Sequence, residues 1–119
     1  MANRKSLTFE KALTRLLGLM GTRVEVTIIS EEPRGLLATF EGELSGAGEI
    51  ESVPYPAGNE GFVFRLGGSQ TATFVLESRM LRRAFLMEST DDRPDSLRFY
   101  LGISTVLQVD PLERPDADG

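Results

Sequence analysis

Residues 23–45 read RVEVTIISEEPRGLLATFEGELS, and this stretch decides the fold. Apolar and polar residues alternate in both halves, which is the period-two pattern of strands with one buried face. Pro33 lacks an amide donor and ends the first run, and Gly35 lets the chain enter the second. The stretch therefore predicts a β-hairpin. Its alternating apolar residues are Val24, Val26 and Ile28, then Leu36, Ala38, Phe40 and Leu44.

A helix is predicted just before this hairpin. From Phe9 onward, apolar residues recur at i, i+3, i+4, i+7, i+8 and i+11, which places them in one stripe of an amphipathic helix. Ser6 or Thr8 can cap the start, and Gly21 stands where a left-handed residue would end the helix. The stripe needs a surface to cover, and the sheet that follows is the nearest one. Its members are Phe9, Ala12, Leu13, Leu16, Leu17 and Met20.

Further strands are predicted after the first hairpin. Alternating runs at 62–66 and 72–76 flank the turn GGSQ and predict a second hairpin. The segment from Ser78 fits a helix or a strand, and we predict a short turn followed by a strand over 82–88. Residues 97–109 read as one strand that is broken or bulged at Gly102.

Composition excludes several classes of site. The 119 residues suffice for one domain that buries about two-thirds of its unfolded surface. The chain has no cysteine and no histidine, which excludes disulfides, thiolate metal sites and a Ser-His-Asp triad. The net charge of -5 disfavours broad attraction to phosphate backbones. We see no signal peptide and no run long enough to span a membrane, and we expect a cytoplasmic location.

Parts of residues 9–45 resemble the Sm-like (LSm) family of small β-barrels. The helix and first strand look like the opening of that family, and the second strand resembles its first motif, a glycine followed by a leucine, a phenylalanine and an acidic residue. The residues of the opening are Leu13, Leu16, Leu17, Val24 and Val26, and those of the motif are Gly35, Leu37, Phe40 and Glu41.

The resemblance implies a ring-forming module whose loops bind single-stranded RNA. Glu41 stands at the acidic position of the motif, and Ser45 stands where the family has an asparagine that helps to hold a base. The second motif of the family, an Arg-Gly pair, is not found, because Arg82 and Arg83 are followed by alanine. The recognition site is therefore altered relative to the family pattern.

With this layout we predict a mainly β fold with an N-terminal helix. The helix packs on a small, strongly bent antiparallel barrel of the Sm-like or SH3-like kind. We expect residues 1–110 to form this single domain and 111–119 to be an acidic, flexible tail.

The densest group of cations is Arg79, Arg82 and Arg83, with Phe85 as an aromatic neighbour. Arginine grips phosphates with two hydrogen bonds and stacks on bases, so this cluster is a candidate nucleic-acid contact. Charges on a strand edge also discourage edge-to-edge pairing, and the sequence favours that structural interpretation.

Glutamates recur at spacing i, i+2 on or after the second strand, at Glu41, Glu43, Glu49 and Glu51. Such pairs can bind a hard cation or share a proton, but they more often lie on the solvent-exposed face of a sheet. We predict no metal site, no cofactor and no catalytic residue, because the chain lacks a usual base and a phosphate-binding loop.

The function we expect is a non-enzymatic, self-associating Sm-like binding or scaffold module, for which the resemblance suggests RNA as the ligand although the acidic net charge disfavours it. Self-association is expected because Phe- and Leu-rich strands in a short chain leave edges that need covering. The candidate ligand-binding residues are Glu41, Ser45, Arg79, Arg82 and Arg83. The alternative is a protein-interaction or regulatory domain with no nucleic-acid role, and a small carboxylate-dependent enzyme ranks third. We expect a homo-oligomer that binds single-stranded RNA or a protein partner and no membrane.

Overall fold

The computed structural model describes residues 4–49, 61–67, 72–88 and 94–112, and these form a mainly β fold with an N-terminal helix, as predicted. The elements are β1 (Arg4–Leu7), α1 (Phe9–Leu17), β2 (Arg23–Glu31), β3 (Arg34–Glu49), β4 (Gly61–Gly67), β5 (Ala72–Glu77), the 3₁₀ helix η1 (Ser78–Met80), β6 (Leu81–Met87), β7 (Ser96–Leu101) and β8 (Thr105–Pro111).

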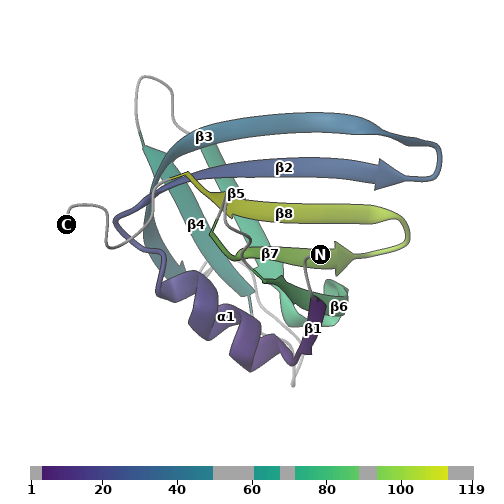
Figure 1. Ribbon diagram of the computed structural model, residues 1–119, viewed down its shortest axis with the longest axis horizontal. Helices are drawn as coiled ribbons and strands as arrows, with labels where there is room; N and C mark the ends of the chain where they lie inside the picture. The colour runs from purple at the N-terminus through teal and green to yellow at the C-terminus, as the bar shows by residue number, and fades with distance from the viewer. Residues whose placement is uncertain (1–3, 50–60, 68–71, 89–93, 113–119) are drawn as a thin grey trace.

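The strands form one antiparallel sheet in the order β1-β6-β7-β8-β2-β3-β4-β5 (Figure 1). The sheet bends strongly: β2, β3, β7 and β8 run side by side, and β4 and β5 cross beneath them at a steep angle. It does not close into the predicted barrel, because no described residue of β1 pairs with β5. Closure is not needed to bury the apolar faces, since α1 lies against the concave side and covers it.

The bend lies within β3, which belongs to both parts of the sheet. Its first half pairs with β2, and its residues from Glu43 onward pair with β4. Where the two parts meet, the backbone of Gly67 lies so close to Gly42 that a Cβ at position 42 would clash with the carbonyl oxygen of Gly67. A glycine is therefore required at this crossing.

The core lies between α1 and the concave face of the sheet. Ala12 and Leu16 of α1 are fully buried there, in one cluster with apolar residues of the strands from β2 to β8. The apolar stripe predicted for the helix therefore docks on the sheet, as expected. The largest fully buried side chains of this cluster are Phe64, Phe99, Leu16, Leu44, Leu66, Leu76, Val24, Val26 and Val109.

The start of α1 follows the predicted signal, whereas its end comes before the predicted one, with Gly18 as the C-cap. The side chain of Thr8 accepts a hydrogen bond from the backbone N–H of Lys11 at 3.2 Å, so Thr8 is the N-cap. The helix ends at Leu17, earlier than the stripe suggested, and Gly21 follows with φ of +88°. Gly21 then donates its N–H to the carbonyl oxygen of Leu44 at 2.8 Å, which ties the end of this turn to β3.

The first hairpin is confirmed, with one difference in register. Ile28 pairs with Ala38 and Ile29 with Leu36, so Leu37 is an extra, bulged residue. Because a bulge reverses the alternation, Leu36 lies on the opposite face from Ala38 rather than on the same face, as the sequence pattern suggested. The peptide bond between Glu32 and Pro33 in the connecting turn is cis.

The second hairpin, β4 with β5, and the turn followed by a strand after Ser78 are also confirmed. The prediction of one interrupted strand over 97–109 is wrong: β7 and β8 are two antiparallel strands. Gly102 adopts φ of +57° in the turn between them, a conformation that glycine permits and that reverses the chain direction.

Both ends of the described chain join the sheet. β1 pairs with β6, which the sequence did not predict. Pro111 and Leu112 were expected to belong to the tail. Pro111 is instead the buried last residue of β8, and Leu112 follows it and donates its N–H to the carbonyl oxygen of Arg23 at 2.9 Å. Residues 113–119 lie outside the described part of the chain.

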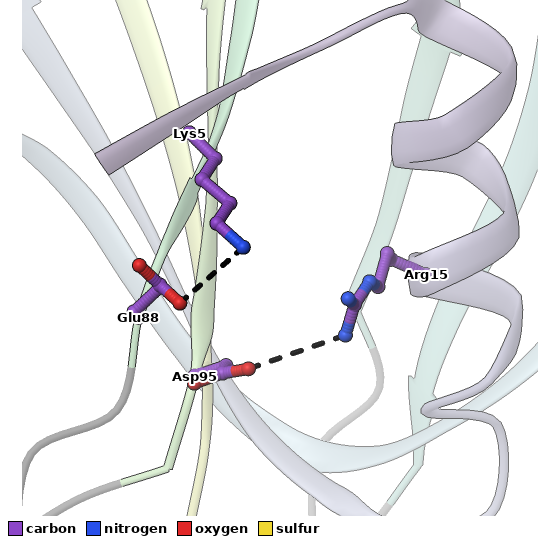
Figure 2. Close-up of polar contacts among 4 residues, drawn as sticks. All are labelled: Lys5, Arg15, Glu88 and Asp95. Carbon is purple, nitrogen blue, oxygen red and sulfur yellow. Dashed lines mark ion pairs between the residues drawn. The ribbon is translucent and has the colours of Figure 1, made fainter. Parts of the chain in front are cut away.

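Two ion pairs join the N-terminal elements to the sheet (Figure 2). Lys5 of β1 lies 3.6 Å from Glu88, just after β6. Arg15 of α1 lies 4.0 Å from Asp95, just before β7. All four side chains are partly exposed, so each pair contributes at most about 1 kcal/mol.

Candidate functional site

Two of the predicted arginines converge on an aromatic ring. Arg83 of β6 pairs with Tyr100 of β7, and Arg82 lies at an irregularity in the same ladder. The guanidinium carbons of Arg82 and Arg83 are 5.9 and 6.0 Å from the centre of the Tyr100 ring. These distances are at the outer limit of a cation–π interaction.

Tyr100 and Phe85 form an aromatic pair with cationic side chains at both ends. Phe85 meets the edge of the Tyr100 ring, with ring centres 5.7 Å apart and planes at 88°. The guanidinium of Arg4, from β1, lies 4.3 Å above the centre of the Phe85 ring. All of these side chains lie on the face of the sheet that α1 does not cover, because their register positions alternate with those of the core residues. We call this the outer face.

An open depression of about 370 Å³ lies next to Tyr100 on the outer face. Its floor is formed by neighbouring strands, since Ile29, Val106 and Tyr100 occupy one row across β2, β8 and β7. Arg34 and Arg98 add two cations to its lining. We define the Tyr100 face as Tyr100 together with Arg34, Arg82, Arg83 and Arg98.

Two hydrogen bonds fix parts of the Tyr100 face. Arg82 donates to a carboxylate oxygen of Glu31 at 2.7 Å, which joins β6 to the end of β2 across two intervening strands. Arg98 donates its Nε–H to the side-chain oxygen of Gln108 at 2.8 Å. Arg82 and Arg98 are thus held by polar partners while their side chains remain partly exposed.

Arg79 lies apart from this arrangement. It belongs to η1, and its Nε is 3.4 Å from a carboxylate oxygen of Glu77. The structure therefore brings Arg82 and Arg83 together with Tyr100. It places Arg79 in η1, just before β6, where Arg79 pairs with Glu77.

The structure places Glu41 and Ser45 elsewhere. Glu41 lies in a row with Glu25 and Asp110, four residues along β2 from the row of Tyr100, which corresponds to about 13 Å. Arg23 donates a hydrogen bond to Glu41 at 2.6 Å. Ser45 is exposed on β3, opposite Arg65. The residues at these two positions of the Sm-like motif, Glu41 and Ser45, are thus separate from the arginines.

The paired glutamates after the first hairpin fall only partly within the described residues. Glu41 and Glu43 are two residues apart on β3 and share its outer face. Glu49 is the last residue of β3, and Glu51 lies outside the described part of the chain. Across residues 4–49, 61–67, 72–88 and 94–112, no group of three or more acidic side chains is arranged to hold a metal ion.

Sequence reasoning missed Tyr100, Arg34 and Arg98. A signal was present, because Arg98 and Tyr100 alternate with buried Leu97 and Phe99 and so belong to the other face of a strand. However, the sequence pattern does not predict the chain reversal at Gly102, so it does not indicate which strands lie beside Arg98 and Tyr100.

A second depression, of about 570 Å³, lies between α1 and the sheet, with Leu7, Leu19, Leu86 and Leu97 among its lining residues. Its polar rim includes Arg15, which is paired with Asp95 (Figure 2). Lys11 also lines it, but none of its described lining residues is aromatic, so it lacks the ring on which the cations of the Tyr100 face converge.

No protein-family model matches the chain, and no curated protein or solved structure matches it. Function must therefore be inferred from the geometry of the site. Within the described ranges, no helix has the length and hydropathy needed to cross a membrane.

Proposed function

We propose that this protein is a non-enzymatic, self-associating binding module that contacts single-stranded RNA through the Tyr100 face. The observation that supports the proposal most strongly is the convergence of Arg82 and Arg83 on the Tyr100 ring beside an open depression. Bases stack on aromatic rings with about 1–3 kcal/mol each, and guanidinium groups bind phosphates with two hydrogen bonds.

The distribution of charge supports a local contact rather than general attraction to nucleic acid. The outer face is acidic at one end, where Glu25, Glu41 and Asp110 form a row, and rich in arginine at the other. An RNA strand would be attracted to the arginine end and repelled by the acidic end. A short segment of single strand fits this pattern better than a long duplex does.

The Sm-like resemblance of residues 9–45 stays a prediction, and the proposal does not depend on it. In that family the acidic residue of the first motif contributes to the nucleotide site, whereas here Glu41 is paired with Arg23. We therefore propose that RNA contacts the arginine end of the outer face and not the Glu41 region.

Fluorescence anisotropy with a labelled single-stranded RNA of about ten nucleotides tests this proposal. The double variant Arg82→Glu, Arg83→Glu should bind about a hundredfold more weakly, because it removes two charge-assisted contacts. Tyr100→Ala should lose about fivefold to a hundredfold through lost stacking. Wild-type affinity should fall steeply as salt rises.

The control variant is Lys11→Glu, Arg15→Glu, which changes the net charge equally but lies on α1. It should retain most of the affinity. Equal losses in the two double variants, or binding that does not respond to salt, would contradict the proposed contact. Absence of any RNA binding would favour the alternative, a protein-interaction domain without a nucleic-acid role.

A further inference from the structure

The depression beside Tyr100 has polar groups of opposite kinds at its two ends. Its floor is the row formed by Tyr100, Val106 and Ile29. Glu31 lies two residues from this row in one direction along the strands, and Arg98 lies two residues from it in the other. Because strands rise about 3.3 Å per residue, the two ends are about 13 Å apart. The depression therefore runs from a carboxylate to a guanidinium over an apolar and aromatic floor.

The carboxylate of Glu31 keeps acceptor sites for a ligand. Its Oε1 accepts the hydrogen bond from Arg82 at 2.7 Å, which holds the group at its end of the depression. Arg34 lies opposite Glu31 in β3, but the described part of the chain contains no ion pair between them. An ionised carboxylate has about four acceptor sites, so Glu31 retains acceptors on both of its oxygens.

The guanidinium of Arg98 keeps donors for a ligand and is held in position by two neighbours. Its Nε–H is bound to the side-chain oxygen of Gln108 at 2.8 Å. Gln108 in turn donates its amide N–H groups to the carboxylate oxygens of Asp110 at 3.1 and 3.0 Å, which fixes the amide. Of the five N–H donors of a guanidinium, the four on its terminal nitrogens remain for a second partner.

We propose that this depression binds a guanine base of the RNA strand, stacked against Tyr100. The inference rests on the proposed RNA contact and names the base that the contact prefers. Glu31 accepts from the N1–H and the N2 amino group of guanine, and Arg98 donates to its O6 and N7. Arginine binds the O6 and N7 of guanine with two hydrogen bonds, and unstacked RNA bases are read on these edges.

The other three bases match the two ends less well. Guanine has two adjacent donors on one edge and two adjacent acceptors on another. In adenine and cytosine the amino group is next to a ring nitrogen that accepts, and in uracil the one ring N–H lies between two oxygens. Each of these bases gives the carboxylate of Glu31 one donor and places an acceptor beside it, so one hydrogen bond is lost and two acceptors face each other.

Fluorescence anisotropy with four labelled RNAs of about ten nucleotides tests the base preference. The reference is oligouridine, and the other three carry a single guanosine, adenosine or cytidine at the centre. The guanosine oligonucleotide should bind about tenfold or more tightly than oligouridine, the discrimination expected of one bidentate arginine–guanine pair. The adenosine and cytidine oligonucleotides should bind within about threefold of oligouridine.

Substitutions identify the residues that read the base. The quantity compared is the ratio of the dissociation constants for oligouridine and the guanosine oligonucleotide, because a general loss of affinity cancels in it. Glu31→Gln replaces an acceptor by a donor, and Arg98→Lys keeps the charge without the planar fork. Each should lower the ratio from about tenfold to below about threefold.

The control is Glu32→Gln, which removes the same charge from the exposed neighbour of Glu31. Glu32 does not line the depression, so the ratio should stay at its wild-type value. An unchanged ratio in both Glu31→Gln and Arg98→Lys would overturn the assignment of these residues to guanine.

The same measurements separate this inference from the proposed function. Equal affinity for all four oligonucleotides would overturn the guanine site and leave the RNA contact standing, whereas no binding of any oligonucleotide would overturn the RNA contact itself. Calorimetric titration with guanosine monophosphate identifies the source of the base. The nucleotide should bind at least about tenfold more weakly than the guanosine oligonucleotide, because it lacks the neighbouring phosphates that arginines contact. Equal affinity would overturn the assignment to RNA in favour of a free nucleotide.

Discussion

The two ends of the β2–β3 hairpin have the same kind of sequence and different surroundings. Near the start of β2, Val24 and Val26 are fully buried beneath α1 and the second part of the sheet. Toward the turn, Leu36 and Leu37 are largely exposed although they are just as apolar. Alternation shows that a strand has two unlike faces, but the bulge at Leu37 turns Leu36 to the outer face, and the extent of α1 and β4 decides which part of the concave face is buried.

This covering has limits set by other elements. α1 is only nine residues long, and β4 meets β3 only from Glu43 onward. The hairpin extends past both, and the turn of β7 and β8 extends beside it (Figure 1). We therefore distinguish a packed end, which holds the core, from a hairpin end, which carries the Tyr100 face and the part of β3 that β4 does not reach.

The largest expected effect is at the packed end. Leu16→Ala should lower the free energy of unfolding by about 2–5 kcal/mol, because Leu16 is fully buried and its removal leaves a cavity. Urea denaturation followed by circular dichroism measures this loss. The control is Leu17→Ala on the same helix, where the side chain is exposed and the loss should be much smaller. An unchanged urea midpoint for Leu16→Ala would mean that α1 does not belong to the core.

The crossing between the two parts of the sheet should show a smaller effect. Gly42→Ala should cost about 1–3 kcal/mol, because its Cβ would clash with the backbone of Gly67. Gly35→Ala is the matched control on the same strand: a Cβ at position 35 would have no heavy atom within 4 Å, so little change is expected. Equal denaturation midpoints for the two variants would mean that β3 and β4 are not so close.

The smallest effect is expected at the hairpin end. Ile103 is 96% exposed in the turn between β7 and β8, so Ile103→Ser should change the free energy of unfolding by less than about 0.5 kcal/mol. Leu107→Ala on β8 is the positive control and should cost about 2–5 kcal/mol because Leu107 is buried. A loss above about 1 kcal/mol for Ile103→Ser would show that the hairpin end is covered in solution.

Local patterns are sufficient to predict much of the fold. The helix and the first two hairpins each have a periodicity that differs from their neighbours and a glycine or proline at the boundary. The turn at Gly102 is hard to predict because apolar residues stand at odd-numbered positions both before and after it, within residues 97–109. A turn that leaves this alternation unchanged looks, in the sequence, like the continuation of one strand. β1 has four residues and no apolar period, so only its pairing with β6 defines it.

The candidate site is predictable only in part. Arg82 and Arg83 are adjacent in sequence and stand out as a cluster. Their partners Tyr100, Arg34 and Glu31 lie on three other strands and are brought together by register and sheet order. Those are properties of long-range pairing, which a single sequence does not specify.

The position of β8 has a consequence for the order in which the protein folds. β2, one of the first strands along the chain, lies between β3 and β8, and Val24 pairs with Pro111. During synthesis, β2 can pair with β3 early but must wait for nearly all of the described chain before its second neighbour exists. Pairings between such distant segments slow folding, because a large loop must close first. A nascent chain would therefore expose the second edge of β2 until β8 has left the ribosome.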